Sequence, residues 1–331
     1  MTDPSATEIS RAVEVLRAGG LVAFPTETVY GLGADASQPD AVRRVFTVKG
    51  RPADHPVIVH LADAGALGEW AAEVPPAADL LTSQCWPGPL TVVVRRAAHV
   101  PDEVTGGLET VGLRVPDQPV ALALLREFAA EGAGGIAAPS ANRFGRVSPT
   151  TAADVRADLG ADVDLVLDGG ECRVGVESTI VDCTGDEPAI LRLGGLARER
   201  IEELLGHSVP VRRGGNGAAD VRAPGTLVSH YAPSAQVLLV DLASVSRVAE
   251  DALARGLAVG VIGEQLPGDL PAGATVLARP ADDADYARHL YRHLRAADAA
   301  DLDTVLAVVP AEVGIGAAVA DRLRRAAGQG T

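Results

Sequence analysis

Apolar and polar positions follow two different rhythms along the first 205 residues. Apolar residues at helical spacing predict helices over 8–18, 40–48, 121–130, 152–159 and 197–205. Short apolar runs predict strands over 21–24, 56–61, 90–94, 110–115, 135–138, 164–167, 178–182 and 189–193. Because the strands and helices are interspersed without strict alternation, the pattern predicts an α/β fold with a mixed sheet.

The pattern breaks down over residues 207–234, where glycine and proline pairs are typical of loops. A second α/β rhythm follows, with strands predicted over 237–240, 258–262 and 304–309 and helices over 245–254, 284–297 and 317–326. These elements predict a smaller, Rossmann-like open-sheet domain. We therefore predict three parts: a domain over 1–206, a linker or lid over 207–234, and a C-terminal domain over 235–331.

Composition adds limits on class and compartment. A length of 331 residues suits two domains, and an apolar content of 47% is ordinary for a globular protein. We expect no signal peptide and no membrane span, because no stretch of the sequence has either pattern. The three cysteines, Cys85, Cys172 and Cys183, form no metal-type pair and suit a reducing compartment. These features together predict a cytoplasmic protein.

Charge argues for a small anionic ligand. The net charge of -15 disfavours a broad nucleic-acid surface, which needs clustered cations. Even so, a basic patch lies within residues 43–60. Of the 29 lysine and arginine residues, only Lys49 is a lysine, and it stands two positions before Arg51. Lysine is a compact point charge, whereas arginine is a planar fork, so we predict that this pair holds a polyphosphate. The alternative is that one lysine survived by chance.

Polar segments follow several of the predicted strands. They cover residues 25–33, 49–60, 137–142 with 148–150, and 175–179. Each has an ordinary alternative: a plain loop, a turn, or a helix cap at Ser148 or Thr150. Together they favour a phosphate-handling site. Arg114 interrupts an apolar strand and needs an anionic partner, either an internal acid or a substrate carboxylate. No P-loop, metal motif or serine-hydrolase elbow occurs.

In the same order along the chain, these segments resemble the YrdC family of threonylcarbamoyl-AMP synthases. The family's K-x-R and S-x-N signature is present as Lys49-Gly50-Arg51 and Ser140-Ala141-Asn142. The segments 25–32, 86–91 and 175–179 match as well, and the resemblance covers about residues 10–205. Residues 229–233 and the C-terminal domain resemble the longer, two-domain members.

The resemblance implies a fold, a reaction and partners. The fold is a twisted α/β sheet with a large concave face. The reaction condenses L-threonine, bicarbonate or carbon dioxide, and ATP into threonylcarbamoyl-adenylate and releases pyrophosphate, with Mg²⁺ bridging the phosphates and no direct protein ligand for the metal. The product then passes to a separate transferase that modifies tRNA. Direct tRNA binding by this chain is expected to be weak or absent, and no membrane is involved.

The resemblance also implies roles for individual residues. Threonine would be contacted by Thr28, His60, Arg114, Ala138 and Ser178. ATP would be contacted by Lys49, Arg51, His55, Thr110, Ser140, Asn142, Ser148, Arg192 and, from the linker, Tyr231. Lys49 and Arg51 would be the catalytic pair, neutralising charge on the leaving pyrophosphate. His55 stands where many relatives carry asparagine.

Two other functions compete with this one. A structured-RNA-binding module without catalysis is disfavoured by the acidity and by an aromatic content of only 3%. A maturation enzyme that uses carbamoyl phosphate would carry zinc-finger and acylphosphatase-like regions, and the sequence suggests neither.

Overall fold

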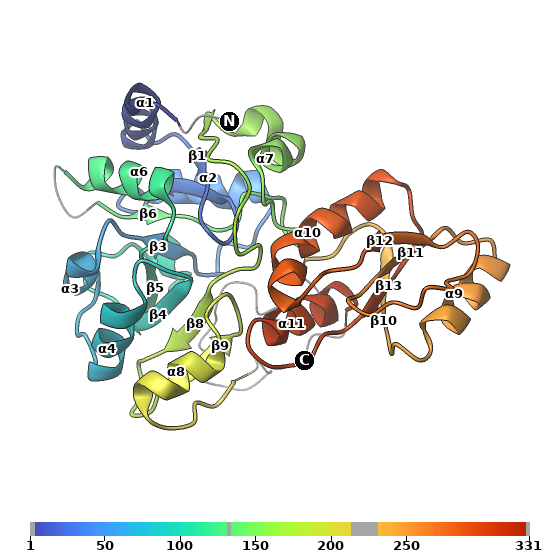
Figure 1. Cartoon of the computed structure of the whole chain (residues 1–331). Coiled ribbons are helices and arrows are strands. Elements are labelled where there is room, and N and C mark those ends of the chain that lie inside the picture. The colour runs from blue at the N-terminus through green and yellow to red at the C-terminus, as the bar shows by residue number, and fades with distance from the viewer. Residues whose placement is uncertain (1–3, 131–133, 213–230, 329–331) are drawn as a thin grey trace. The chain divides into compact units, whose positions relative to one another are not determined.

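The structure is a computed structural model that describes residues 4–130, 134–212 and 231–328. It divides into two units, each coloured by its place in the chain in Figure 1. The N-terminal unit comprises residues 1–144, 148–173 and 177–226, and the C-terminal unit comprises 227–331 with the short segments 145–147 and 174–176. The predicted boundaries at 206 and 234 stay a prediction, because residues 213–230 lie outside the described residues.

A mixed sheet organises the N-terminal unit. Its strands in the described residues lie in the order β7-β1-β2-β6-β3-β5-β4-β8-β9. Their bounds are β1 Val22–Phe24, β2 Gly31–Asp35, β3 Ile58–His60, β4 Leu90–Arg95, β5 Thr110–Arg114, β6 Ile136–Ala137, β7 Leu165–Val166, β8 Thr179–Asp182 and β9 Ala189–Arg192. β3 runs parallel to β5 and β4 runs parallel to β8, whereas β4 and β5 are antiparallel. The predicted mixed sheet is confirmed.

Helices bury apolar stripes against this sheet. They are α1 Ala6–Arg17, α2 Pro39–Lys49, α3 Leu67–Trp70, α4 Pro76–Cys85, α5 Asp102–Thr105, α6 Pro119–Ala129, α7 Ala152–Leu159 and α8 Arg198–Leu205, with short 3₁₀ turns at Ala64–Ala66 and Gly160–Asp162. A capping box between Ser5 and Glu8 begins α1. Gly50 ends α2 in the left-handed conformation, at φ 64°, which leaves Lys49 in the last helical turn.

The two faces of the central strands differ in character. Side chains alternate along a strand, so Val57, Val59 and Leu61 point to one face, where they join the main apolar core. Ile58 points to the other face, where it forms a separate small cluster with Val93, Ile180 and Leu191. His60 and Arg114 share that second face by the same alternation and register. The second face therefore carries the predicted ligand-binding side chains of β3 and β5.

The C-terminal unit contains a parallel sheet. Its described strands are β10 Gln236–Val240, β11 Val259–Ile262, β12 Thr275–Ala278 and β13 Thr304–Val308, in the order β10-β13-β11-β12. Its helices are α9 Val245–Ala254, α10 Asp283–Ala299 and α11 Gly316–Ala326. This arrangement confirms the predicted small α/β domain. None of the helices in the described part of the chain combines the length and the apolar character needed to cross a bilayer.

Candidate active site

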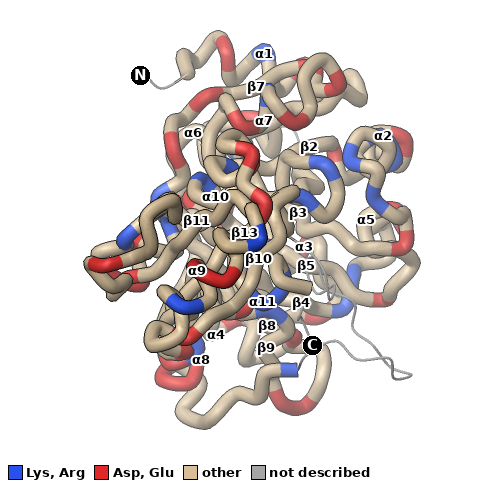
Figure 2. The backbone as a smooth tube through the Cα atoms, turned by 90° about the vertical axis from the view of Figure 1, so that its right-hand side faces the viewer, with Lys and Arg blue, Asp and Glu red and all other residues tan. Residues whose placement is uncertain are grey.

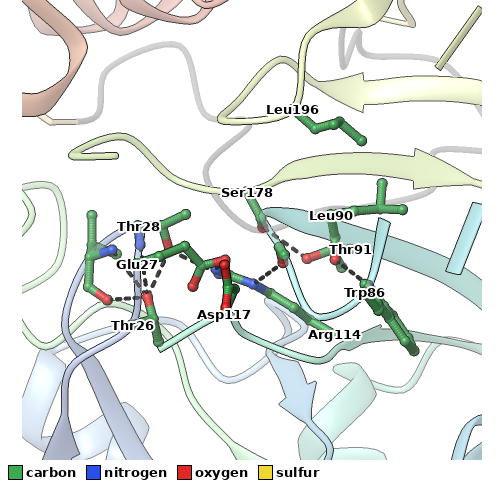
Figure 3. Close-up of polar contacts among 12 residues, drawn as sticks. Thr26, Glu27, Thr28, Trp86, Leu90, Thr91, Arg114, Asp117, Ser178 and Leu196 are labelled. Carbon is green, nitrogen blue, oxygen red and sulfur yellow. Dashed lines mark hydrogen bonds and ion pairs between the residues drawn. The ribbon is translucent and has the colours of Figure 1, made fainter. Parts of the chain in front are cut away.

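Arg114 is the central charge of the candidate site. It ends β5 and pairs in register with His60 on β3. Its guanidinium is buried: Nη1 donates to Thr28 Oγ1 at 2.9 Å, and Nε donates to the Gly88 carbonyl at 3.3 Å. Figure 3 shows this side chain extending from the sheet towards the loop that carries Thr28. Strand pairing and these contacts fix the arginine in one orientation.

Glu27, which is not among the predicted site residues, is the internal acid beside Arg114. Its Oε1 lies 2.7 Å from Arg114 Nη2, and both side chains are almost completely inaccessible to solvent. Neither carboxylate oxygen has a hydrogen-bond partner among the described residues, so the contact is an ion pair without hydrogen-bond geometry. The sequence does contain a signal for this acid: Glu27 stands between two threonines soon after a buried strand. Of the two partners considered for Arg114, the structure supplies the internal acid, and the substrate carboxylate stays a prediction.

His60 lies on β3, next to the strand of Arg114, and Ala138 follows β6 on the other side of β3. His60 pairs with Ile136 of β6, and the Ala138 amide donates to the Ile58 carbonyl at 2.9 Å. Burial, and secondarily the charge of Arg114, lowers the pKa of His60 to about 3. The imidazole is therefore neutral at physiological pH and adds no second cation to the site.

The low pKa of His60 makes stability depend on pH. A group with a folded-state pKa of about 3 and an ordinary value of 6.5 contributes stability that is present above pH 6.5 and is lost as the pH falls towards 3. Between pH 6.5 and 4.5 this loss amounts to about 2–3 kcal/mol. We expect His60→Gln to flatten the dependence of the unfolding free energy on pH, measured by urea denaturation across that range. His207→Gln, at an exposed position, is the control, and equal slopes in all three proteins would contradict the prediction.

A second group of side chains surrounds Ser178, directly before β8. Its hydroxyl shares a hydrogen bond of 2.8 Å with Thr91 Oγ1 and accepts one from Arg192 Nη2 at 3.1 Å. Arg192 Nε and Nη2 also donate to the Ser178 carbonyl, at 3.1 and 2.9 Å. Figure 3 shows Ser178 and Thr91 facing each other. The register that pairs Val92 with Leu113 brings Thr91 to the cross-strand position next to Arg114, so the two groups adjoin.

Gly194 explains how Ser178 is held. A Cβ atom at position 194 would lie 2.3 Å from the Glu177 carbonyl oxygen, 2.4 Å from the Ser178 carbonyl carbon and 2.5 Å from the Thr179 nitrogen. These are backbone atoms, so the loop itself would have to move. This close approach could not be predicted from the sequence, because it depends on how the chain folds back after β9.

We expect Gly194→Ala to displace Ser178. The substitution should lower the unfolding free energy by about 1–3 kcal/mol. Because the resemblance implies that Ser178 contacts threonine, the substitution should also raise the KM for threonine more than the KM for ATP. Gly185→Ala, in the connection between β8 and β9, is a matched control. A Cβ atom at position 185 would lie 3.9 Å from the Glu187 carbonyl oxygen, which is an ordinary contact. Chemical denaturation and initial-rate kinetics measure both effects. Equal threonine KM values in the two variants would show that Gly194 does not position Ser178.

Lys49 is buried and points into the protein. Its ammonium donates to the carbonyl of Asn142 at 2.6 Å and to that of Ser140. The Phe144 amide also donates to the Lys49 carbonyl at 2.8 Å, so both the side chain and the main chain hold the 140–144 loop. Burial, followed by the charge of Arg51, lowers the pKa of Lys49 well below its ordinary value. The K-x-R and S-x-N segments are thus brought together, as the sequence predicted for one site.

The other predicted ATP contacts of the N-terminal unit border this loop or the second face of the sheet. Arg51 donates to the Pro56 carbonyl at 2.7 Å, and the His55 ring lies edge-on to Phe144, with 5.8 Å between ring centroids. Figure 2 shows basic positions gathered along α2 and the segment after it. Thr110 begins β5 and lines a small cavity with Gly112 and Ile180.

Ser148 does not act as a helix cap. Its hydroxyl donates to Glu177 Oε1 at 2.7 Å, next to Ser178. Thr151 caps α7 instead, in a capping box with Asp154. The alternative that Ser148 or Thr150 caps this helix is therefore wrong, and Ser148 is tied to the segment that carries Ser178.

Tyr231 belongs to the C-terminal unit. Its ring stacks on Tyr291 with 5.8 Å between centroids, and the Arg322 guanidinium lies 5.1 Å from its centroid. Its φ of 63° is unusual for a residue other than glycine. The predicted contact between Tyr231 and ATP stays a prediction. The neighbouring Ser229 and His230, also part of the predicted lid, lie outside the described residues.

Comparison with known proteins shows the family to which this fold belongs. The family model for Sua5, YciO and YrdC proteins, described as "Telomere recombination", matches residues 14–194. The model for the C-terminal domain of threonylcarbamoyl-AMP synthase matches residues 196–328. The chain belongs to the Sua5/YciO/YrdC family, in its two-domain form.

Full-length relatives share both units. The threonylcarbamoyl-AMP synthase of Pyrococcus abyssi is 42% identical over 97% of this chain and 94% of its own length. The threonylcarbamoyl-AMP synthase of Bacillus subtilis is 38% identical over 97% of this chain and 93% of its own. The crystal structure of P. abyssi Sua5 complexed with L-threonine matches with a TM-score of 0.91 and 40% identity, covering 99% of this chain and 96% of that one.

Proposed function

We propose that this chain catalyses the synthesis of threonylcarbamoyl-AMP from L-threonine, bicarbonate or carbon dioxide, and ATP. The observation that carries the proposal is the buried Arg114, which lies beside hydroxyl groups on the face of the sheet opposite the main core. Relatives matching nearly the whole chain are named for this activity, which favours it over RNA binding without catalysis.

The threonine end of the site would be built on Arg114. Its guanidinium is buried and fixed, so it would bind the substrate carboxylate with little reorganisation. The hydroxyls of Thr28 and Ser178 and the neutral imidazole of His60 are short polar groups suited to the amino and hydroxyl groups of threonine. The Ala138 backbone, which follows β6, would close this end. Glu27 would act through Arg114, holding its orientation.

The ATP end would lie along the Lys49 loop and the neighbouring strands. Lys49 has three donors and uses two on carbonyls, so the third would face a phosphate. Arg51 and His55, together with Ser140, Asn142, Ser148 and Arg192, would surround the rest of the triphosphate. Thr110 and the small cluster of Ile58, Val93 and Ile180 would contact the nucleoside. Mg²⁺ would enter on the phosphates of ATP, as part of the substrate.

The proposed chemistry needs no protein nucleophile. The amine of threonine attacks carbon dioxide and loses a proton, which gives a carbamate. A carbamate oxygen then attacks the α-phosphorus of ATP, and the bond to the β-phosphate oxygen breaks to release pyrophosphate. The protein brings two anions together and stabilises charge on the leaving group, which is positioning and electrostatic stabilisation. The predicted lid over 207–234 would exclude water from the mixed anhydride.

Pyrophosphate release tests the proposal directly. The full chain with ATP, Mg²⁺ and bicarbonate should release pyrophosphate only when threonine is present, and mass spectrometry should detect threonylcarbamoyl-AMP. Valine has nearly the same shape without the hydroxyl, so it would leave the hydroxyl-binding groups unpaired and should support turnover about 10⁴-fold less well. Binding to structured RNA with no threonine-dependent pyrophosphate would favour the alternative function.

The product would be consumed elsewhere. A mixed anhydride of a carbamate is an activated acyl donor, so we propose that it passes in the cytoplasm to a separate tRNA threonylcarbamoyl transferase. The net charge of -15 suggests that this chain binds tRNA weakly or not at all.

A further inference from the structure

The C-terminal unit contains a cavity that the proposed reaction does not use. Its volume is about 470 Å³, within the usual range for small-molecule sites. Apolar groups from the ends of β10 and β13, among them Leu239, Leu242 and Val308, line about half of it. Its polar lining includes Asp241 and Glu264.

The cavity lies where an open parallel sheet characteristically binds ligands. β10 and β13 are parallel neighbours, and the cavity lies at their carboxyl ends. The chain leaves β10 for α9 and leaves β13 for α11, and these helices cover opposite faces of the sheet (Figure 1). Helices that diverge in this way leave a crevice between the two strand ends, and ligands of α/β proteins bind at this point.

The charges of the cavity select the class of ligand. Among the residues that the structure describes, no lysine, arginine or histidine lines it, whereas two carboxyl groups do. Glu264 also shares a hydrogen bond with Asp283, and its Oε1 is buried without a hydrogen-bond partner among the described residues. Burial, the hydrogen bond and the charges of Asp283 and Asp282 raise the pKa of Glu264. An anionic ligand would be repelled here, whereas a cation would relieve the crowding of acidic groups.

We propose that this cavity binds a small organic ammonium ion, with the ammonium group on Glu264 and an apolar body against the ends of β10 and β13. A metal ion suits the site less well, because no group of three or more histidine, cysteine or acidic side chains able to hold one occurs in the described residues. The apolar lining would instead contact a hydrocarbon body. The proposal rests on the C-terminal unit alone and is independent of the reaction proposed above.

Calorimetric titration of the full chain with phenethylamine, which is protonated at neutral pH, tests the proposal. We expect saturable binding that is at least about tenfold tighter than that of 2-phenylethanol, with 3-phenylpropanoate not binding. Glu264→Gln should weaken phenethylamine binding by at least about tenfold, whereas Glu250→Gln on the exposed side of α9 should leave it unchanged. Binding of the amine should release a proton from the pair of Glu264 and Asp283 in the wild-type chain and not in Glu264→Gln. Titrations in buffers of different ionisation enthalpy measure this release.

Several results would overturn the proposal. They are no binding of phenethylamine up to about 10 mM, equal affinity for the alcohol, or equal affinity in Glu264→Gln. Should Glu264→Gln alter the near-ultraviolet circular dichroism of the chain, Ala311→Phe provides a second variant. Ala311 lines the cavity from an exposed position, so a larger side chain there should block the amine without disturbing the core. Undiminished binding in Ala311→Phe would equally rule out this cavity.

Discussion

Arg114→Gln should lower the free energy of unfolding by about 3–5 kcal/mol and reduce threonine-dependent pyrophosphate release by about 10²–10³-fold. The stability loss follows from Glu27, which would be left as a buried carboxylate without its ion-pair partner. The activity loss follows from the proposed role of Arg114 as the clamp for the substrate carboxylate. A loss of activity in this variant alone could therefore reflect poor folding.

The double variant Glu27→Gln/Arg114→Gln separates the two effects. Removing both charges leaves two neutral amides, so most of the lost stability should return. Activity should not return, because the carboxylate clamp is still missing. Urea denaturation and pyrophosphate release, measured on the same preparations, test both halves of this expectation.

The surface of the same unit offers a control. Arg200 pairs with Glu203 at 2.7 Å on α8, with the two side chains 43% and 68% exposed. Arg200→Gln should change the unfolding free energy by less than about 1 kcal/mol and leave turnover unchanged.

Wild-type turnover in the double variant would show that Arg114 does not bind the substrate, and wild-type stability of Arg114→Gln would show that the ion pair contributes little.

Much of this fold could be predicted from periodicity. α7 and α9 have the predicted bounds, and β8 and β11 each begin within one residue of the predicted start. Such elements have a clear apolar stripe or a run of β-branched residues between turn residues, so local pattern and tertiary context agree. The site residues could be grouped because polar side chains follow buried strands, and the Lys49 and Ser140 segments do meet.

The elements that were missed lack that local signal. β2, Gly31–Asp35, contains two glycines and an aspartate, which disfavour strands. It forms by pairing with β1 and β6, and position 33 requires glycine, because a Cβ there would lie 2.8 Å from both Phe24 Cε1 and Ile136 Cγ2. β12, Thr275–Ala278, is an edge strand with two exposed residues, so its apolar pattern is weak. Glu27 and Thr91 were missed because their partners, Arg114 and Ser178, are distant in the sequence.

The burial of Lys49 suggests why an arginine-rich chain keeps a lysine there. The ammonium is a compact charge that fits between the carbonyls of Ser140 and Asn142. A planar guanidinium is larger and presents its donors in a fork, so Lys49→Arg would crowd a side chain that is only 3% exposed. We therefore expect Lys49→Arg to lose function although it keeps the positive charge.

We expect Lys49→Met to lower kcat by about 10²–10³-fold and to weaken pyrophosphate binding, while threonine binding stays within about threefold of wild type. Methionine keeps the apolar stem and removes only the charge. Arg143→Met is the matched control. Like Lys49, Arg143 is a cation that donates to a backbone carbonyl, in this case that of Val48 in α2, but its side chain is 45% exposed. Isothermal titrations with pyrophosphate and threonine separate the two possible roles of the ammonium. If Lys49 only holds the 140–144 loop, Lys49→Met will weaken threonine and pyrophosphate binding together, since Ala138 leads into that loop. If it contacts a phosphate, pyrophosphate binding alone will fall.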